Sequence, residues 1–144
     1  MGKKRIIKKK GGTVDHGLKA RAMSRIPKKK ISKGIINILS TYNNTLVSVS
    51  DDNGGVLIWS SSGSLGFKGA KKGTPFAASK VAEVVADKAS LIGMKEADVV
   101  VRGVGAGRDS AIRTFASRGI EINSILDTTP VPHNGPKAKK PRRV

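Results

Sequence analysis

The sequence contains no cysteine, few aromatic residues and no long apolar run. The absence of cysteine excludes a disulfide framework, a thiolate metal site and a cysteine nucleophile. Aromatic residues make up 3% of the chain, too few for the stacking platform that single-strand binders use. No apolar segment approaches the roughly 18 residues of a membrane span, and no apolar stretch follows the basic N-terminus. We therefore expect neither a membrane helix nor a secretory signal.

Acidic residues are nearly absent from the two ends of the chain. Residues 1–33 contain thirteen Lys and Arg against one acid, and residues 128–144 contain five against none. The segment 34–127 has ten basic and nine acidic residues, although the whole chain carries a formal net charge of +18. Because mutual repulsion within such ends opposes folding, they indicate a polyanionic partner such as a nucleic acid. We therefore predict an N-terminal arm at 1–33, a core at 34–127 and a C-terminal arm at 128–144.

The N-terminal arm carries nine of its thirteen cations in three clusters, interrupted by Gly11-Gly12 and Pro27. It has too little apolar surface to offset the entropy of ordering, so we expect it to be disordered alone and to fold on RNA. The alternative is a solvated tail. The clustered residues, which we predict to bind RNA, are Lys3, Lys4, Arg5, Lys8, Lys9, Lys10, Lys28, Lys29 and Lys30.

The first half of the core predicts antiparallel strands. Apolar or alternating runs are joined by the turns Tyr42-Asn43-Asn44 and Asp52-Asn53-Gly54, both typical of hairpins. The predicted strands lie near residues 35–39, 45–50 and 56–59.

The second half predicts two helices and two further strands. Thr74 and Pro75 fit the cap and first position of a helix that continues to about Ile92. An unbroken apolar run at 98–102 predicts a strand covered on both faces, and a second helix then ends near Arg118. Its buried side is predicted to comprise Ile112, Phe115 and Ala116. A last strand at 120–125 completes the order βββαβαβ, an α/β fold with a mixed sheet.

The Gly/Ser/Lys segment 60–75 predicts a loop that lies on a nucleic-acid backbone. Its lysines Lys68, Lys71 and Lys72 would neutralise phosphates, and its glycines would allow close approach. Phe67 could stack on a base or fold back into the core. Trp59 and Phe76 are predicted to pack at the end of a strand and the start of a helix.

The segment Gly103-Val104-Gly105-Ala106-Gly107-Arg108 joins a strand to a helix. It lacks the glycine pattern of a dinucleotide fingerprint and the Gly-Lys-Ser/Thr ending of a Walker A loop. The alternatives are a plain tight turn and an anion site made by backbone amides at a helix N-terminus. Arg108, Arg113 and Arg118 favour the anion site.

The C-terminal arm begins with a proline-rich segment and ends with a basic run. Prolines make such a segment stiff, so it could enter a groove of folded RNA at little entropic cost. A solvated tail is the alternative. Its cations are Lys137, Lys139, Lys140, Arg142 and Arg143.

The acids are poorly arranged for catalysis. Three strands followed by a helix resemble the start of ribonuclease-H-like nucleases, which bind metals through several carboxylates. Here Asp51 and Asp52 lie in a turn, and His16 and His133 have no evident partner for base catalysis. We therefore expect no enzyme, metal or other cofactor. A metal-dependent nuclease and a general nucleic-acid chaperone are the alternatives.

Several motifs, in order and with matching spacing over residues 33–144, resemble the small-subunit ribosomal protein S11 family of bacterial or organellar type. They are TYNNTLVSVSD at 41–51, WSSSGSLGFKGAKKGTPFAA at 59–78, VVVRGVGAGRDSAIR at 99–113, DTTPVPHNG at 127–135 and the terminal PRRV.

This resemblance implies a ribonuclease-H-like core without nuclease chemistry, bound to ribosomal RNA of the small-subunit platform near the messenger RNA exit path. It implies neighbouring ribosomal proteins as partners, no membrane or small-molecule substrate, and a ribosome-bound location in the cytoplasm or an organelle. The RNA-contacting positions that it implies are Asn43, Asn44, Lys68, Lys71, Lys72, Thr74, Gly105, Gly107, Arg108, Arg113, Pro132, His133, Asn134, Gly135, Lys139, Lys140, Arg142 and Arg143.

Overall fold

A computed structural model describes residues 16–143, which contain one five-stranded sheet and its helices. The elements in chain order are α1 (His16–Ser24), β1 (Lys33–Ser40), β2 (Thr45–Ser50), β3 (Val56–Ser61), the 3₁₀ helix η1 (Gly69–Gly73), α2 (Pro75–Leu91), β4 (Glu96–Arg102), α3 (Arg108–Ser117) and β5 (Glu121–Asp127). The strand order is β3-β2-β1-β4-β5. β2 is antiparallel to β1 and β3, whereas β4 is parallel to β1 and β5. The predicted mixed α/β sheet is therefore confirmed.

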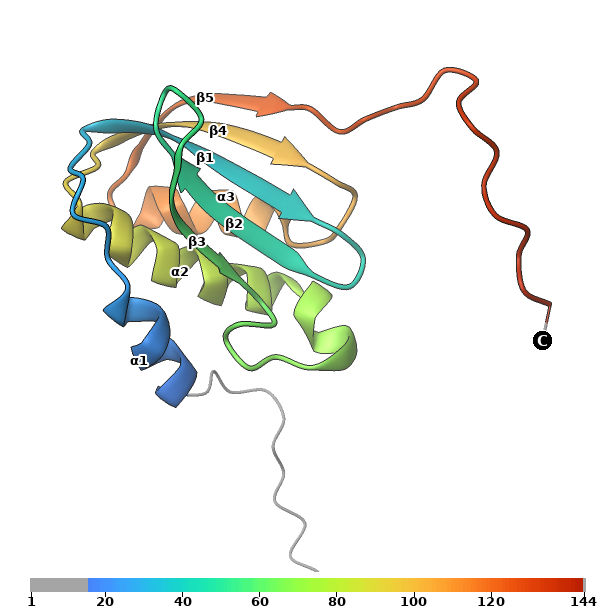
Figure 1. Cartoon of the computed structure of the whole chain (residues 1–144), viewed down its shortest axis with the longest axis horizontal. Helices are drawn as coiled ribbons and strands as arrows, with labels where there is room; N and C mark the ends of the chain where they lie inside the picture. Colours follow the sequence, from blue (N-terminus) through green and yellow to red (C-terminus); the bar gives the residue numbers. More distant parts are fainter. Residues whose placement is uncertain (1–15, 144) are drawn as a thin grey trace, which may run out of the picture.

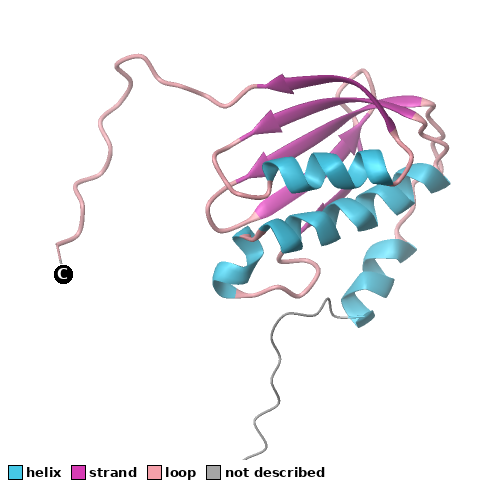
Figure 2. Cartoon of the chain, turned by 180° about the vertical axis from the view of Figure 1, so that it is seen from behind, coloured by secondary structure: helices cyan, strands magenta, loops and turns pink. Residues whose placement is uncertain are grey.

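The helices lie on one face of the sheet. Figure 1 and Figure 2 show α2 and α3 side by side against this face, with α1 beside α2. In β1, Ile36 and Ile38 face these helices and are buried, whereas Ile35 and Asn37 between them are half-exposed. The core is thus a single layer of side chains between the sheet and the helices.

α2 forms as predicted, because its apolar residues recur with helical period and its start is capped. Thr74 Oγ1 accepts a hydrogen bond from Ala77 N at 3.3 Å, and Pro75 occupies the first position. In α3 the predicted buried side is partly wrong: Phe115 is buried and Ile112 packs against the core, but Ala116 is exposed and Ala111 is buried instead.

β4 was predicted to be covered on both faces, and this is wrong. Ala97, Val99 and Val101 are buried against the helices, but Asp98 and Val100 are half-exposed on the opposite face. The apolar run reflects the strand preference of β-branched valine rather than a second covering layer.

The expectation of disorder is wrong for residues 16–24, which form α1. Ala22 and Met23 pack against the core, as does Ile31, whose N–H donates to Ile92 O at 3.2 Å. A helix this short is stabilised mainly by tertiary packing. The composition of the segment, which is rich in lysine and arginine, therefore did not indicate a helix. Residues 1–15, including the clusters at 3–5 and 8–10, lie outside the described residues.

Candidate nucleic-acid interface

Four connecting segments meet at one edge of the sheet, which we call the loop edge. β1, β3, β4 and β5 all point the same way, so the segments that follow them emerge together. These segments comprise residues 41–44, 62–74, 103–107 and 128–135. In Figure 1 they lie at the end of the sheet from which the C-terminal arm departs. Ligands of open α/β sheets commonly bind at the carboxyl ends of strands.

The segments of the loop edge pack through their backbones against one another and against the ends of β1 and β2. The Gly105 N–H donates to Ser40 O at 2.8 Å, and Ser62 N–H donates to Thr45 O at 3.0 Å. A Cβ atom at Gly73 would lie only 2.1 Å from Tyr42 O, so this contact requires glycine. The loop edge is therefore a tightly packed platform rather than a set of independent loops.

The loop edge presents lysines that have no acidic partner among residues 16–143. Lys68 and Lys71 are exposed, and Lys72 is half-exposed. The described ion pairs involve other cations. The 3₁₀ helix η1 places Lys71 and Lys72 in its last turn, just before the N-terminus of α2. This arrangement concentrates positive potential where two helices, α2 and α3, also begin.

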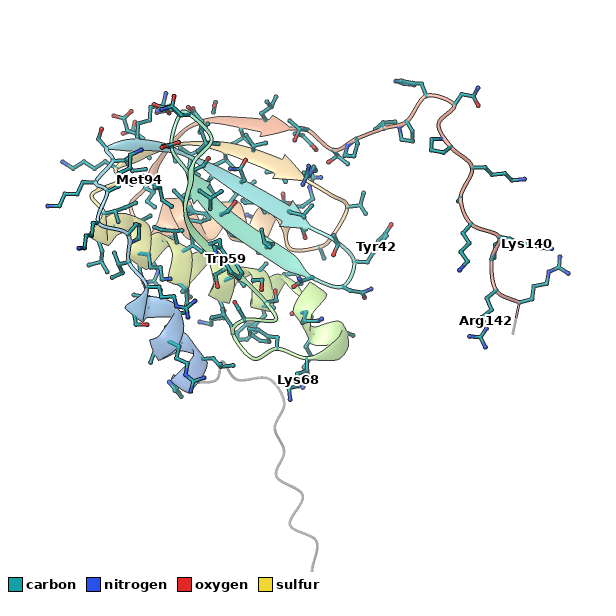
Figure 3. All side chains as sticks on the ribbon, in the orientation of Figure 1. Tyr42, Trp59, Lys68, Met94, Lys140 and Arg142 are labelled. Carbon is teal, nitrogen blue, oxygen red and sulfur yellow. The ribbon has the colours of Figure 1, made fainter. Side chains whose placement is uncertain are left out.

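Two exposed residues in or next to the loop edge were missed by sequence reasoning. Tyr42, at the tip of the β1–β2 turn, has 78% of its surface exposed, and Arg102 is exposed at the end of β4. Figure 3 shows Tyr42 projecting from this turn. A tyrosine followed by two turn-forming asparagines was a usable signal, because a turn holds an aromatic ring outside the core.

Phe67 is a core residue and not a base-stacking residue. It is 6% exposed and packs edge-on against Phe76, with ring centroids 6.1 Å apart. The prediction that Trp59 packs at the end of a strand is wrong, since it is 59% exposed. Phe76 does pack at the start of α2, through its contact with Phe67, although 53% of it is exposed. Ile58 and Ser60 occupy the inward positions of β3, so strand alternation turns Trp59 outward.

The two glycines predicted to receive RNA are buried. Gly105 uses its N–H on Ser40, and a Cβ atom at Gly107 would lie 2.6 Å from Ala78 Cβ. This corrects the expectation that both glycines present themselves to an anion. Their role in the structure is close packing of the turn against β1 and α2.

Arg108 fastens the start of the C-terminal arm. Its guanidinium donates to Gly103 O, to Thr129 Oγ1 at 3.2 Å and to the carboxylate of Asp127. Hydrogen bonds from Thr129 and then from Arg108 hold the pKa of Asp127 well below its usual value. Arg108 therefore acts within the protein as a brace for the arm.

The two other helix arginines lie away from this brace. Arg113 is exposed midway along α3. Arg118 follows the helix at its far end, where it bonds Asp87 at 3.0 Å and approaches Glu83 at 3.6 Å. The structure does not bring Arg118 to the loop edge.

The cluster Lys28, Lys29 and Lys30 precedes β1, at the opposite edge of the sheet from the loops. Lys29 pairs with Asp51 at 2.5 Å, while Lys28 and Lys30 are exposed. The cluster at 28–30 and the C-terminal cations therefore lie at opposite ends of the sheet.

The C-terminal arm extends away from the globule, as Figure 3 shows for Lys140 and Arg142. Pro132, His133, Asn134 and Gly135 are exposed, and Asn134 adopts a positive φ of 56°. The further cations Lys137, Lys139, Lys140, Arg142 and Arg143 are exposed as well. Asn43 is exposed and Asn44 half-exposed in the β1–β2 turn, while Thr74 is occupied in capping α2.

Within residues 16–143, no group of three or more His, Asp or Glu side chains is arranged to hold a metal ion. None of the helices in this range has both the length and the apolar character of a membrane span.

A comparison with protein families matches residues 34–143 to the family described as ribosomal protein S11. The match covers the whole sheet apart from Lys33, both packed helices, the loop edge and the C-terminal arm.

Proposed function

Because the chain belongs to the ribosomal protein S11 family, we propose that the loop edge and the C-terminal arm are its main contacts with ribosomal RNA. The family consists of small-subunit ribosomal proteins that bind ribosomal RNA beside neighbouring ribosomal proteins, a structural and non-catalytic class. We further propose a position on the platform near the messenger RNA exit path, and a ribonuclease-H-like core, both of which follow from the sequence resemblance.

The observation that carries the proposal is the concentration of lysines without acidic partners at the loop edge. Lys68, Lys71 and Lys72 lie together beside the N-termini of α2 and α3, where helix dipoles favour phosphate. Phosphate contacts position a protein on RNA, whereas exposed side chains that stack or bond to bases supply local specificity. Tyr42, Asn43 and Asn44 are suited to that second role.

The proposed RNA contacts now comprise fewer core residues than the sequence predicted. Phe67, Gly105 and Gly107 support the surface from within, and Arg108 and Thr74 are engaged in the protein's own hydrogen bonds. The proposed contacts are Tyr42, Asn43, Asn44, Lys68, Lys71, Lys72, Arg102, Arg113 and the exposed residues 132–143. The cluster at 28–30 would bind RNA separately, at the end of the sheet opposite the loop edge.

The deciding test replaces Lys68, Lys71 and Lys72 together by Gln and measures binding to a small-subunit ribosomal RNA fragment at several salt concentrations. Each phosphate contact that is lost should lower the slope of log K against log salt by about 0.7–0.9. Lys95→Gln is the control, because Lys95 is exposed just before β4 at the edge opposite the loops. An unchanged slope in the triple variant would contradict the proposal.

The same preparation separates the alternatives. A ribosomal protein should sediment with small subunits in a sucrose gradient and prefer its own RNA fold. Equal binding to any RNA or DNA would favour a nucleic-acid chaperone, and magnesium-dependent degradation of the RNA would favour a nuclease.

A further inference from the structure

A cavity of about 650 Å³ lies between α1 and the edge strand β3, on the flank of the sheet. Its volume falls within the roughly 300–1,000 Å³ of small-ligand sites. It is lined by Leu18, Arg21, Ala22, Ser24 and Arg25 from α1 and the residue after it, by Leu57, Ile58, Trp59 and Ser60 from β3, and by Ser64 and Lys88. The lysines at 68, 71 and 72 do not line it.

Lys88 is the unusual member of this lining. It projects from α2 and is only 5% exposed, although lysine is rarely buried without a partner. Among residues 16–143, no acceptor forms a hydrogen bond or ion pair with its ammonium group. Burial, and then the nearby charge of Arg25, lower the pKa of Lys88. The side chain is largely buried, but its ammonium group is not among the fully enclosed polar atoms and lines the cavity. A partly desolvated ammonium without a counter-charge is costly, so an anion in the cavity would reduce that cost.

The rest of the lining also suits an anion. Arg21 and Arg25 are exposed beside the cavity, and none of the Asp and Glu residues between 16 and 143 lines it. Ser24, Ser60 and Ser64 add hydroxyl groups, which can donate to phosphate oxygens once they turn from their present partners. Three cations and three hydroxyls of the described residues therefore line this space, and no carboxylate of the described part of the chain does.

The cavity also contains the protein's one tryptophan. Trp59 is 59% exposed at the β3 edge, on the side of the molecule where α1 lies (Figure 3). An exposed indole ring is a surface on which a nucleobase can stack, with a typical contribution of about 1–3 kcal/mol per base. Leu57 and Leu18 are half-exposed in the same lining and add apolar area beside the ring.

We propose that the cavity between α1 and β3 binds a nucleoside phosphate, with the phosphate held by Lys88, Arg21 and Arg25 and the base stacked on Trp59. The phosphate could belong to a nucleotide of a single-stranded RNA segment or to a free nucleotide. In the first case the inference rests on the proposed function and adds an RNA contact that is separate from the loop edge. In the second case it gives the protein a small-molecule site.

Trp59 makes this proposal directly measurable, because it is the protein's one tryptophan and lines the cavity. The full-length protein is titrated at about physiological salt with adenosine monophosphate, adenosine, inorganic phosphate, a short single-stranded RNA and a poly-glutamate peptide. We expect saturable quenching by adenosine monophosphate or by the RNA, and at least about tenfold weaker binding of adenosine, since charge-assisted hydrogen bonds supply much of the affinity. Quenching by the monophosphate identifies a free nucleotide as a ligand, and quenching by the RNA alone identifies a strand.

Lys88→Met is the central variant, because it keeps the apolar stem and removes the charge. Lys88→Met should weaken the binding of the quenching ligand at least about tenfold. It should also raise the melting temperature, since a largely buried charge without a partner is removed. Arg25→Gln, at an exposed position that does not endanger folding, should weaken binding as well. The triple Gln variant at 68, 71 and 72 serves as the matched control, and should retain the quenching while losing affinity for the ribosomal RNA fragment.

Four outcomes would overturn the inference. They are absence of saturable quenching by both phosphate ligands, equal binding by Lys88→Met and the unaltered protein, equal binding of adenosine and its monophosphate, and quenching by poly-glutamate alone, which would indicate an acidic protein partner. Failure of the proposed function is distinguishable, because it would appear as an unchanged salt slope in the triple variant whatever Trp59 reports.

Discussion

At the scale of single residues, glycine determines how closely the segments of the loop edge can approach one another. Gly103 has a φ of +101°, and a Cβ atom there would lie 2.2 Å from Ser40 O, a backbone atom that cannot move without displacing β1. Both its conformation and its space therefore exclude other residues. The same glycine carbonyl accepts from Arg108, so a shift at this point would also loosen the brace of the C-terminal arm.

Gly103→Ala should accordingly lower the free energy of unfolding by about 3 kcal/mol or more, combining left-handed strain with the clash. Gly54→Ala is a matched control, because Gly54 has a φ of +83° but nothing lies within 4 Å of its Cβ position. It should lose only the conformational part, about 1–2 kcal/mol. Urea unfolding followed by circular dichroism measures both, and equal losses would show that the close approach to Ser40 is unimportant.

At the scale of elements, α1 shows how a basic segment can be both an arm and part of the fold. The helix is polar on average and none of its residues is fully buried, yet Ala22 and Met23 pack against the core. The helix also closes one side of the cavity that contains Lys88. Its packing, rather than its helix propensity, therefore determines whether residues 16–24 are ordered.

Met23→Ala should lower the free energy of unfolding by about 1 kcal/mol, because a half-buried side chain loses part of its apolar contact. Ala20→Ser, at an exposed position of the same helix, should change it by less than about 0.5 kcal/mol. Thermal unfolding of both variants tests this. If the two variants have the same stability, α1 does not contribute to the core.

At the scale of the whole molecule, the part of the chain that stabilises the fold differs from the part that carries most of the C-terminal charge. The sheet and its helices supply the core, while residues 136–143 are exposed and carry five cations without adding to it. The arm begins at the Arg108–Asp127–Thr129 brace, which fixes its direction at the loop edge. Removal of the C-terminal cations should therefore lower the affinity for RNA without unfolding the protein.

Removing residues 136–144 should therefore leave the melting temperature unchanged while reducing the salt dependence of RNA binding. The slope of log K against log salt should fall by up to about 4, if all five cations contact phosphate. A tail of equal length with Gln in place of Lys and Arg controls for chain length. A truncated protein that melts earlier would show that the arm stabilises the core.

Sequence patterns predicted the local features well, because their causes lie within a few residues. Thr74 and Pro75 start α2 where a cap and a first-turn proline are expected, and the strands appear close to their predicted positions. The candidate site was predicted less well. The exposed lysines of the loop follow from composition, but the burial of Phe67 and the exposure of Trp59 depend on which positions of β3 and its loop face α2.

By itself, the sequence determined the charged ends, the order of strands and helices in the core and the basic character of the loops, since charge and periodicity are local properties. Only the tertiary structure decided which loops meet at one edge, because that depends on the order β3-β2-β1-β4-β5 and on strand direction. It also decided that Arg108 pairs with Asp127, nineteen residues away, and that Lys88 lies buried behind α1. Such contacts join residues distant in the chain, and neither partner carries a signal of the other.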